Sequence, residues 1–234
     1  MSVPSRLPLA GAGILLAVAA CLLPGRVPGT EGAATRTLFD ASAFADADWR
    51  HVRFVNETRY AADALDGERV IEAVPAQSSS VLLRPAMFDI ARCPTLEWRW
   101  AVTGLQPDAD IRVRNKEDVG AALFVLFGEP VSPLGLRDVP TLRYVWTNSS
   151  VAAGSIVDSP FMPGVVRSIV VRSGLTADRQ LVTEIRDVAD DFRAAFGREP
   201  PAAVHAIGIF ADNDQTGQPA RSHFAWARAL CGSR

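Results

Sequence analysis

The sequence is divided into short β-prone segments separated by turn residues, and only one stretch has the pattern of a helix. The segment Thr95 to Val102 (TLEWRWAV) alternates along its length, and Ala121 to Phe127 (AALFVLF) is a continuous apolar run. Alternation is typical of a strand with one buried face, and a short apolar run is typical of a strand buried on both faces. About nine or ten such segments predict an antiparallel β-sandwich rather than a parallel sheet with alternating helices.

Residues 187–196 are the stretch with a helical pattern. Asp187 is a suitable N-cap residue, and an acidic residue three positions later forms a weak version of a capping box. Gly197 and the two prolines at 200 and 201 stop the helix. The apolar stripe has the i, i+3, i+7 spacing and consists of Ala189, Phe192 and Phe196. We therefore expect an all-β domain with one short helix.

The first thirty residues have the layout of a secretory signal. Arg6 provides a short positive region, the segment Leu9 to Leu23 is apolar, and prolines and glycines follow it. We predict a signal peptide over 1–30, a linker over 31–37 and a single β-sandwich domain over 38–231. The apolar run is shorter than the roughly 20 residues that a membrane span needs. No transmembrane span is therefore expected after signal removal.

The signal contains a cysteine that would change the final location of the protein if it were lipidated. The sequence Val18-Ala19-Ala20-Cys21 resembles a bacterial lipobox, in which a small residue precedes the modified cysteine. The alternative is an ordinary signal whose apolar region contains a cysteine. The protein is expected to be exported, either to the periplasm as a free domain or as a domain anchored in the envelope through Cys21.

Two cysteines, Cys93 and Cys231, remain beyond the signal. In an oxidising compartment they can pair, because Cys93 opens one predicted strand and Cys231 closes the last one. The alternative is two unpaired cysteines. With no histidine near them in sequence, they make a poor metal site.

The turn after the segment Val204 to Ala211 carries the most distinctive polar residues. The run Asp212-Asn213-Asp214-Gln215-Thr216-Gly217 has oxygen-bearing side chains at alternate positions, like the first half of a calcium loop. The second half is absent, because His223 stands where a bidentate glutamate would fall. An Asx-type turn is the alternative. Calcium is the one cofactor that the pattern allows, with Asp212, Asp214 and Thr216 as candidate ligands, and no other cofactor is expected.

Arginines at strand ends could bind a polar ligand together with these aspartates. Arg172 and Arg186 each close an apolar strand, where a guanidinium can hold a carboxylate or sugar hydroxyls. A structural ion pair is the alternative, and Asp187 is explained by the helix dipole alone. The hypothesis is that the turn at 212–217 lies next to residues 184–191. The candidate ligand site then consists of Arg172, Arg186, Asp187, Asp212 and Asp214.

Carboxylates are the candidate catalytic groups. Two carboxylates about 5–10 Å apart would permit glycoside hydrolysis, and the candidates are Asp118, Asp187 and Asp212. Glu117 could supply a second carboxylate beside Asp118. The motifs of serine hydrolases, zinc proteases and nucleotide-binding enzymes are absent from the sequence, which leans against an enzyme. The formal net charge of −2 gives no reason to expect a nucleic-acid partner.

Aromatic residues at period two in the predicted strands have two interpretations. They could form a platform on which sugars stack, but this spacing is more often found in a core. The residues concerned are Trp98, Trp100, Tyr144, Trp146, Phe224 and Trp226.

Several sequence blocks resemble one bacterial family. They include Trp98-Arg99-Trp100, Glu117-Asp118 before an apolar strand, Phe196-Gly197-Arg198-Glu199-Pro200-Pro201 and the turn Asp212 to Gly217. In this order, from about Phe39 to Trp226, they are similar to the family catalogued as domain of unknown function 3047. The resemblance implies an exported, jelly-roll-like β-sandwich, similar to galactose-binding and carbohydrate-binding modules, and no established activity. Leu123 departs from the family pattern, in which an arginine often follows the acidic pair.

The sequence therefore supports three hypotheses about function. The first is an exported β-sandwich that binds a glycan or another small polar ligand. The second is a carboxylate-dependent glycan hydrolase or lyase. The third is a structural envelope protein without a ligand, in which the same charged residues stabilise the fold.

Overall fold

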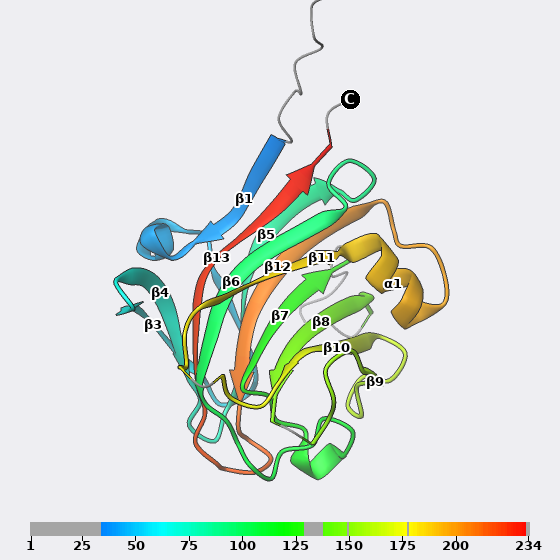
Figure 1. Cartoon of the computed structure of the whole chain (residues 1–234). Coiled ribbons are helices and arrows are strands. Elements are labelled where there is room, and N and C mark those ends of the chain that lie inside the picture. The colour runs from blue at the N-terminus through cyan, green and yellow to red at the C-terminus, as the bar shows by residue number, and fades with distance from the viewer. Residues whose placement is uncertain (1–33, 129–137, 149, 177, 233–234) are drawn as a thin grey trace, which may run out of the picture. The chain divides into compact units, whose positions relative to one another are not determined.

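A computed structural model describes residues 34–128, 138–148, 150–176 and 178–232 (Figure 1). The predicted signal peptide over 1–30, including Cys21, lies outside the described residues, as do the first residues of the predicted linker. None of the described helices is both long and apolar enough to cross a membrane.

Two sheets form the described domain. The first sheet has the order β11 (Val182–Asp187), β6 (Thr95–Gly104), β13 (Arg221–Cys231), β4 (Glu68–Val74) and β3 (Arg59–Leu65), and β1 (Ala34–Asp40) also pairs with β13. The second sheet has the order β2 (Arg50–Val55), β5 (Ser79–Asp89), β12 (Ala203–Asp212), β7 (Ala121–Leu126), β8 (Thr141–Thr147), β10 (Val166–Ser173) and β9 (Ile156–Asp158). The chain is therefore a β-sandwich, as predicted.

Successive strands often belong to different sheets. The chain passes between the sheets from β1 to β2, from β2 to β3, at each step from β4 to β7, and at each step from β10 to β13. Repeated crossing between two packed sheets is the connectivity of a jelly roll. The pairing is antiparallel except between β8 and β10, which are parallel because the chain returns through β9 before it enters β10.

The core lies between the two sheets and is rich in aromatic side chains. Trp98 of the first sheet packs on Tyr144 of the second, with ring centroids 5.0 Å apart. Trp100 contacts both Trp146 and Phe224 in the same way. These five side chains are buried and Trp226 is largely covered, so the strand aromatics form packing contacts rather than an exposed platform for sugars.

A second hydrophobic cluster covers the outer face of the seven-stranded sheet. Strand β7 supplies both clusters, because Leu123 and Val125 point into the sandwich while Phe124 and Leu126 point outward. This two-sided burial explains why AALFVLF is continuously apolar. The outer cluster also includes Val81 and Phe210.

The helix α1 (Val188–Phe196) has the predicted ends. The Asp187 side chain accepts a hydrogen bond from the backbone N–H of Asp190 at 2.8 Å, and Gly197 ends the helix with a φ of 66°. Within the helix, Asp191 accepts hydrogen bonds from the Tyr144 hydroxyl at 2.9 Å and from the Arg186 Nε at 2.9 Å. These contacts fix α1 to the core and to β11. Two 3₁₀ helices, η1 (Ala41–Asp46) and η2 (Arg114–Lys116), lie in connections.

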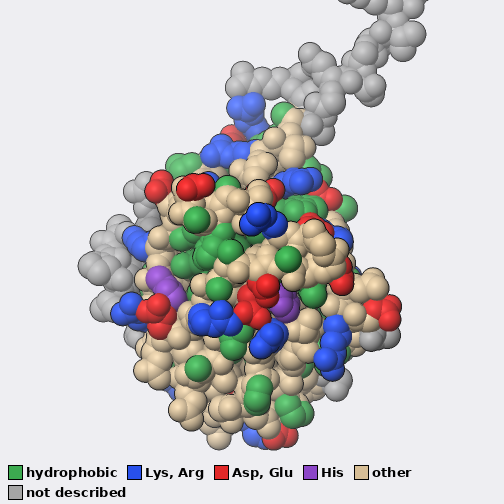
Figure 2. All heavy atoms as spheres, turned by 90° about the vertical axis from the view of Figure 1, so that its left-hand side faces the viewer, with side chains coloured by type: hydrophobic (Ala, Val, Ile, Leu, Met, Phe, Trp, Pro, Cys, Tyr) green, Lys and Arg blue, Asp and Glu red, His purple; other side chains and the backbone are tan. Residues whose placement is uncertain are grey.

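The first strand begins earlier than the sequence indicated. Residues 34–37 belong to β1 and pair with β13, so this part of the predicted linker is strand. The side chains of these residues are exposed, and an edge strand held by backbone hydrogen bonds needs no apolar pattern. Figure 2 views the domain from the side on which β3 and β4 lie, where charged side chains of both signs gather below a hydrophobic patch.

Cys93 and Cys231 are joined by a disulfide in the structure. Cys93 follows β5, Cys231 ends β13, and 138 residues separate the two in sequence. The bond therefore closes a loop that includes half of the strands of the first sheet and most of those of the second. A cross-link over a long loop lowers the entropy of the unfolded chain and so stabilises the folded state.

Replacing both cysteines with serine should lower the free energy of unfolding by about 2–4 kcal/mol, because the unfolded chain regains the freedom that the cross-link removes. Urea unfolding without reductant measures the change. Wild-type protein unfolded in the presence of a reductant is the control and should lose the same amount. Unchanged unfolding midpoints in both samples would contradict a stabilising disulfide.

Candidate functional site

A cavity of about 290 Å³ lies on the outer face of the seven-stranded sheet, where β12 ends and β7 begins. Its apolar wall is formed mainly by Phe54, Phe124, Phe161, Met162 and Phe210. Its polar groups include Ser79, Glu117, Arg143, Asp212, Asp214 and Gln215. Aromatic and ionisable side chains that are far apart in sequence thus face one space.

Three phenylalanines of the wall pack against one another, and a fourth, Phe161, lies beside an arginine. The Phe210 ring centroid lies 5.1 Å from that of Phe124 and 6.4 Å from that of Phe54. Phe54 is 43% exposed and Phe161 is 38% exposed, so both can contact a ligand that enters the cavity. The Arg114 guanidinium lies 4.3 Å from the Phe161 ring centroid and donates to the Pro160 carbonyl, which holds this part of the wall.

Two buried aspartates connect the segment before β7 with the turn after β12. Asp212 accepts a hydrogen bond from the Val119 backbone N–H at 2.8 Å. In return, Asp118 accepts bonds from the backbone N–H of Thr216 at 2.7 Å and of Gln215 at 3.1 Å. We call this reciprocal arrangement the aspartate clip. It places both segments at one edge of the cavity.

Inside the turn each polar side chain has a separate partner. The Thr216 hydroxyl donates to Asp118 at 2.6 Å, and the Asn213 side-chain oxygen accepts from the Ser78 backbone N–H at 3.2 Å. Gly217, with a φ of 67°, donates to the Asn213 carbonyl and closes the turn. The hydroxyl of Thr216, a candidate metal ligand beside Asp212 and Asp214, thus donates to Asp118, whose carboxylate lies in one cluster with those two aspartates.

A buried ion pair forms the floor of the cavity. The Arg143 guanidinium donates to Glu117, and its Nε donates to the Ser168 hydroxyl at 2.8 Å. Arg143 and Glu117 are each about 95% buried, so the pair is well shielded from water. Burial of this kind is tolerated when the charges are paired and hydrogen-bonded.

The remaining carboxylates of the cavity, Asp212 and Asp214, form no ion pair with an arginine in the described part of the chain, although the charge of Arg143 acts on Asp212. Burial, followed by the charges of Glu117 and Asp118, raises the pKa of Asp212 well above its usual value. Burial also raises the pKa of Glu117, although Arg143 acts against the shift. The pKa of Asp214 is raised by burial and by Asp118. The carboxylates therefore repel one another. Binding of a proton, a cation or a ligand that donates hydrogen bonds would reduce this repulsion.

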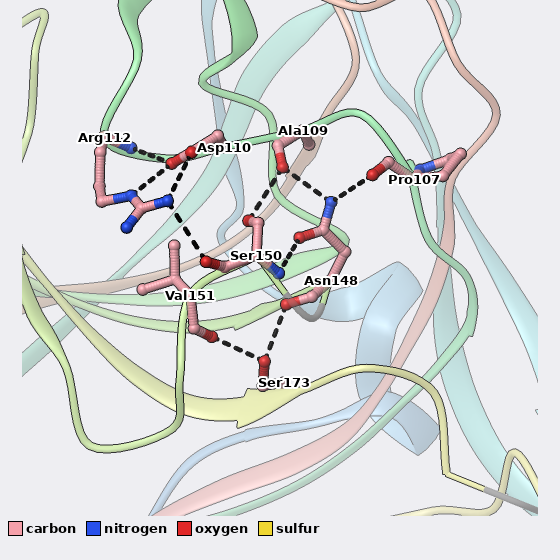
Figure 3. A network of polar contacts seen from close by, with 8 residues as sticks. All are labelled: Pro107, Ala109, Asp110, Arg112, Asn148, Ser150, Val151 and Ser173. Carbon is pink, nitrogen blue, oxygen red and sulfur yellow. Dashed lines mark hydrogen bonds and ion pairs between the residues drawn. The ribbon is translucent and has the colours of Figure 1, made fainter.

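Hydrogen bonds between loops fix the position of Asp212 in the aspartate clip. The Asn148 side-chain amide donates to the carbonyls of Gln106 and Ala109 at 2.7 Å and of Pro107 at 3.0 Å, as Figure 3 shows in part. Gln106 in turn donates to the Asp212 carbonyl. The loop between β6 and β7 is thereby held against both the 148–151 segment and the end of β12.

The five predicted ligand-binding residues do not form one site. Arg172 pairs with Glu184, Arg186 pairs with Asp191, and Asp187 caps α1. Only Asp212 and Asp214 line the cavity. Helix α1 precedes β12 and the turn at 212–217 follows it, so they lie near opposite ends of this strand (Figure 1). Ten residues of strand span about 30 Å. The hypothesis that the turn lies next to residues 184–191 is therefore wrong.

Of the three candidate catalytic residues, only one faces the cavity. Asp212 lines it, Asp118 lies behind with no exposed surface, and Asp187 is occupied as the helix cap. Asp118, Asp212 and Asp214 each place a carboxylate oxygen within 4.8 Å of the other two, so these three residues at the edge of the cavity could hold a divalent cation such as calcium.

Several residues of the site were not selected from the sequence. Arg143 lies in the alternating segment TLRYVW. Its position on the outward face of this strand was the one sequence feature that could have identified it. Phe161 and Met162 come from a loop rich in serine, glycine and proline, whose sequence has no pattern that indicates a binding site. Phe54 and Phe124 resemble ordinary strand residues. Their convergence depends on the sheet order, which the sequence did not specify.

The fold and the cavity together define a jelly-roll β-sandwich with an acidic, aromatic-lined pocket on one outer sheet face. The chain belongs to the family described as Protein of unknown function (DUF3047), whose sequence model matches residues 47–227. The resemblance seen in the sequence blocks is thereby confirmed. No curated protein matches the chain.

Solved structures with a similar arrangement include carbohydrate-binding modules. A family 11 module from Clostridium thermocellum, in complex with a β-1,3-1,4-mixed-linked tetrasaccharide, has 6% identity and a TM-score of 0.44, over 85% of this chain and 96% of that one. A family 30 module of a C. thermocellum cellulosomal cellulase has 8% identity and a TM-score of 0.45, over 86% and 99%. A carbohydrate esterase from the Shiga toxin-encoding bacteriophage phi24B has 12% identity and a TM-score of 0.42, over 86% and 100%.

The buried charge of Asp212 should make stability depend on pH. Because its pKa is raised in the folded protein, the folded state holds the proton more tightly than the unfolded chain. The resulting stability is complete below the unfolded pKa near 4 and is lost as the pH rises toward the folded pKa, by up to about 1.4 kcal/mol per pH unit. Asp212→Asn should therefore gain stability relative to wild type as the pH rises.

Urea unfolding of both proteins between about pH 5 and pH 9 measures this gain. Asp110→Asn is the control, because a hydrogen bond from Arg112 lowers the pKa of Asp110 and its titration lies below this range. A constant difference between Asp212→Asn and wild type over the range would contradict the raised pKa.

Proposed function

We propose that this protein is an exported β-sandwich module that binds a glycan or a similar polar ligand in the cavity beside the aspartate clip. The observation that carries the proposal is the combination of one aromatic wall with several polar groups in a single open cavity. Binding sites for small molecules are concave, largely apolar and equipped with a few convergent polar groups.

The two halves of the cavity match the two kinds of surface on a sugar ring. The C–H faces of a pyranose are apolar and can pack flat on Phe54 or Phe161, both partly exposed. The hydroxyl groups lie around the ring edge and can donate to Asp212 and Asp214. Carboxylates are acceptors of strong hydrogen bonds, so they favour a ligand rich in donors.

Export is part of the proposal. The layout of residues 1–30 supports a secretory signal, and Cys21 supports an envelope-anchored form as the alternative to a free periplasmic domain. Either route would bring the cavity into contact with the polysaccharides of the cell envelope. The disulfide between Cys93 and Cys231 agrees with an oxidising compartment.

A carboxylate-dependent glycan hydrolase or lyase is the second candidate. The observation that favours it is the raised pKa of Asp212, Glu117 and Asp214 around one cavity, since a carboxyl that stays protonated can act as a general acid. Cleavage of a bound glycan by wild type, together with loss of cleavage but not of binding in Asp212→Asn, would establish this function.

A glycan array built from envelope polysaccharides, followed by calorimetry on the hits, tests binding. Phe161→Ala and Asp214→Asn should each weaken binding at least tenfold, about 1.4 kcal/mol, with little change in melting temperature. Both side chains reach the cavity without belonging to the core between the sheets.

Arg186→Gln is the matched control. It removes the ion pair with Asp191 far from the cavity, so it should lower the melting temperature and leave glycan affinity unchanged. No binding to any polysaccharide would count against the proposal. A large loss of stability in Phe161→Ala and Asp214→Asn, together with no glycan binding by wild type, would support a structural envelope protein instead.

A further inference from the structure

Three side chains on the outer face of the six-stranded sheet form a cluster separate from the cavity. Asp63 comes from β3, Glu72 from β4 and His223 from β13, and each offers one ligand atom within 4.8 Å of the other two. Glu72 and His223 are direct partners across the β4–β13 pair. Asp63 pairs with Val70, two residues before Glu72 and on the same face. Figure 2 shows the side of the molecule on which β3 and β4 lie.

His223 is buried without a hydrogen bond. The residue is only 4% exposed, and its Nδ1 is buried with no partner among the described residues. Its Nε2 lies 4.0 Å from Glu72 Oε1, which is too far for a hydrogen bond. The buried Nδ1 is therefore unsatisfied, and such a group costs free energy.

The His223 ring lies beside two carboxylates, and one of its nitrogens is within 4.8 Å of an oxygen of Asp63 and of Glu72. A neutral imidazole keeps a lone pair on one of its two nitrogens. A neutral imidazole with carboxylate oxygens is a donor set for zinc and related divalent metals.

We propose that Asp63, Glu72 and His223 form a binding site for a divalent transition metal of the zinc type. Three protein ligands on three adjacent strands leave a fourth position for water, as in zinc sites with an open position. Ligand atoms in a tetrahedral zinc site lie about 3.4 Å apart, so these atoms, which are within 4.8 Å of one another, need to close by at most about 1.5 Å. Asp63 is exposed and can supply much of this movement.

Two arginines beside Glu72 would affect the affinity of the site for a metal ion. Arg59 binds Glu72 Oε2 at 2.5 Å, while Arg221 binds Oε1 at 3.1 Å, the oxygen that also faces His223. The Arg221 side chain is 56% exposed and can turn into solvent. The metal and Arg221 thus compete for one oxygen, whereas Arg59 can stay in place.

Calorimetric titration of the untagged full chain with zinc chloride at about pH 7.5 tests the site. Wild type should bind one zinc ion. His223→Gln should bind it at least tenfold more weakly, because an amide is a poor zinc ligand. Arg221→Gln should bind it several-fold more tightly, because the competitor for Oε1 is gone. A purely structural cluster would show no such gain.

Two further variants are controls for the zinc titration. Arg53→Gln removes another exposed, ion-paired arginine and should leave zinc affinity unchanged. Asp214→Asn reports on the acidic cavity and should also have no effect. The melting temperature of zinc-free His223→Gln shows whether the variant is folded. The proposal is overturned if wild type binds no zinc, if Arg221→Gln gains no affinity, or if Asp214→Asn loses the binding.

Discussion

The aspartate clip is the constraint on which the cavity depends. Asp118 and Asp212 are both buried, and each accepts hydrogen bonds from backbone N–H groups of the segment that carries the other. Charged groups are costly to bury, so the clip holds only while these bonds are made. The same bonds fix the start of β7 and the turn after β12, and with them one edge of the cavity.

Much of the fold could be predicted from the sequence because it depends on local patterns. The period of two in TLEWRWAV and the apolar run AALFVLF each reflect which faces of one strand are buried. The helix α1 is specified by its own cap, stripe and terminal glycine. These signals lie within a few residues of one another, so no knowledge of the sheet order was needed to find them.

The site could be predicted only in part because it depends on pairing between distant strands. Asp212 and Asp214 stood out in a short turn, but their neighbours follow from the antiparallel register of β12 with β7, which brings Asp212 next to Val119. The mistaken link to α1 came from closeness in sequence. A ten-residue strand carries the chain across the whole sheet, so elements at its two ends are far apart.

The distribution of arginines separates structural carboxylates from those open to a ligand. Glu184 is paired with Arg172, Asp191 with Arg186 and Glu117 with Arg143, so the charge of each is balanced within the fold. In the described chain Asp212 and Asp214 have no such partner, although both line the cavity. Since an unbalanced carboxylate favours any group that donates hydrogen bonds or positive charge, selectivity in this cavity is expected to depend on these two aspartates, while the phenylalanines supply contact area.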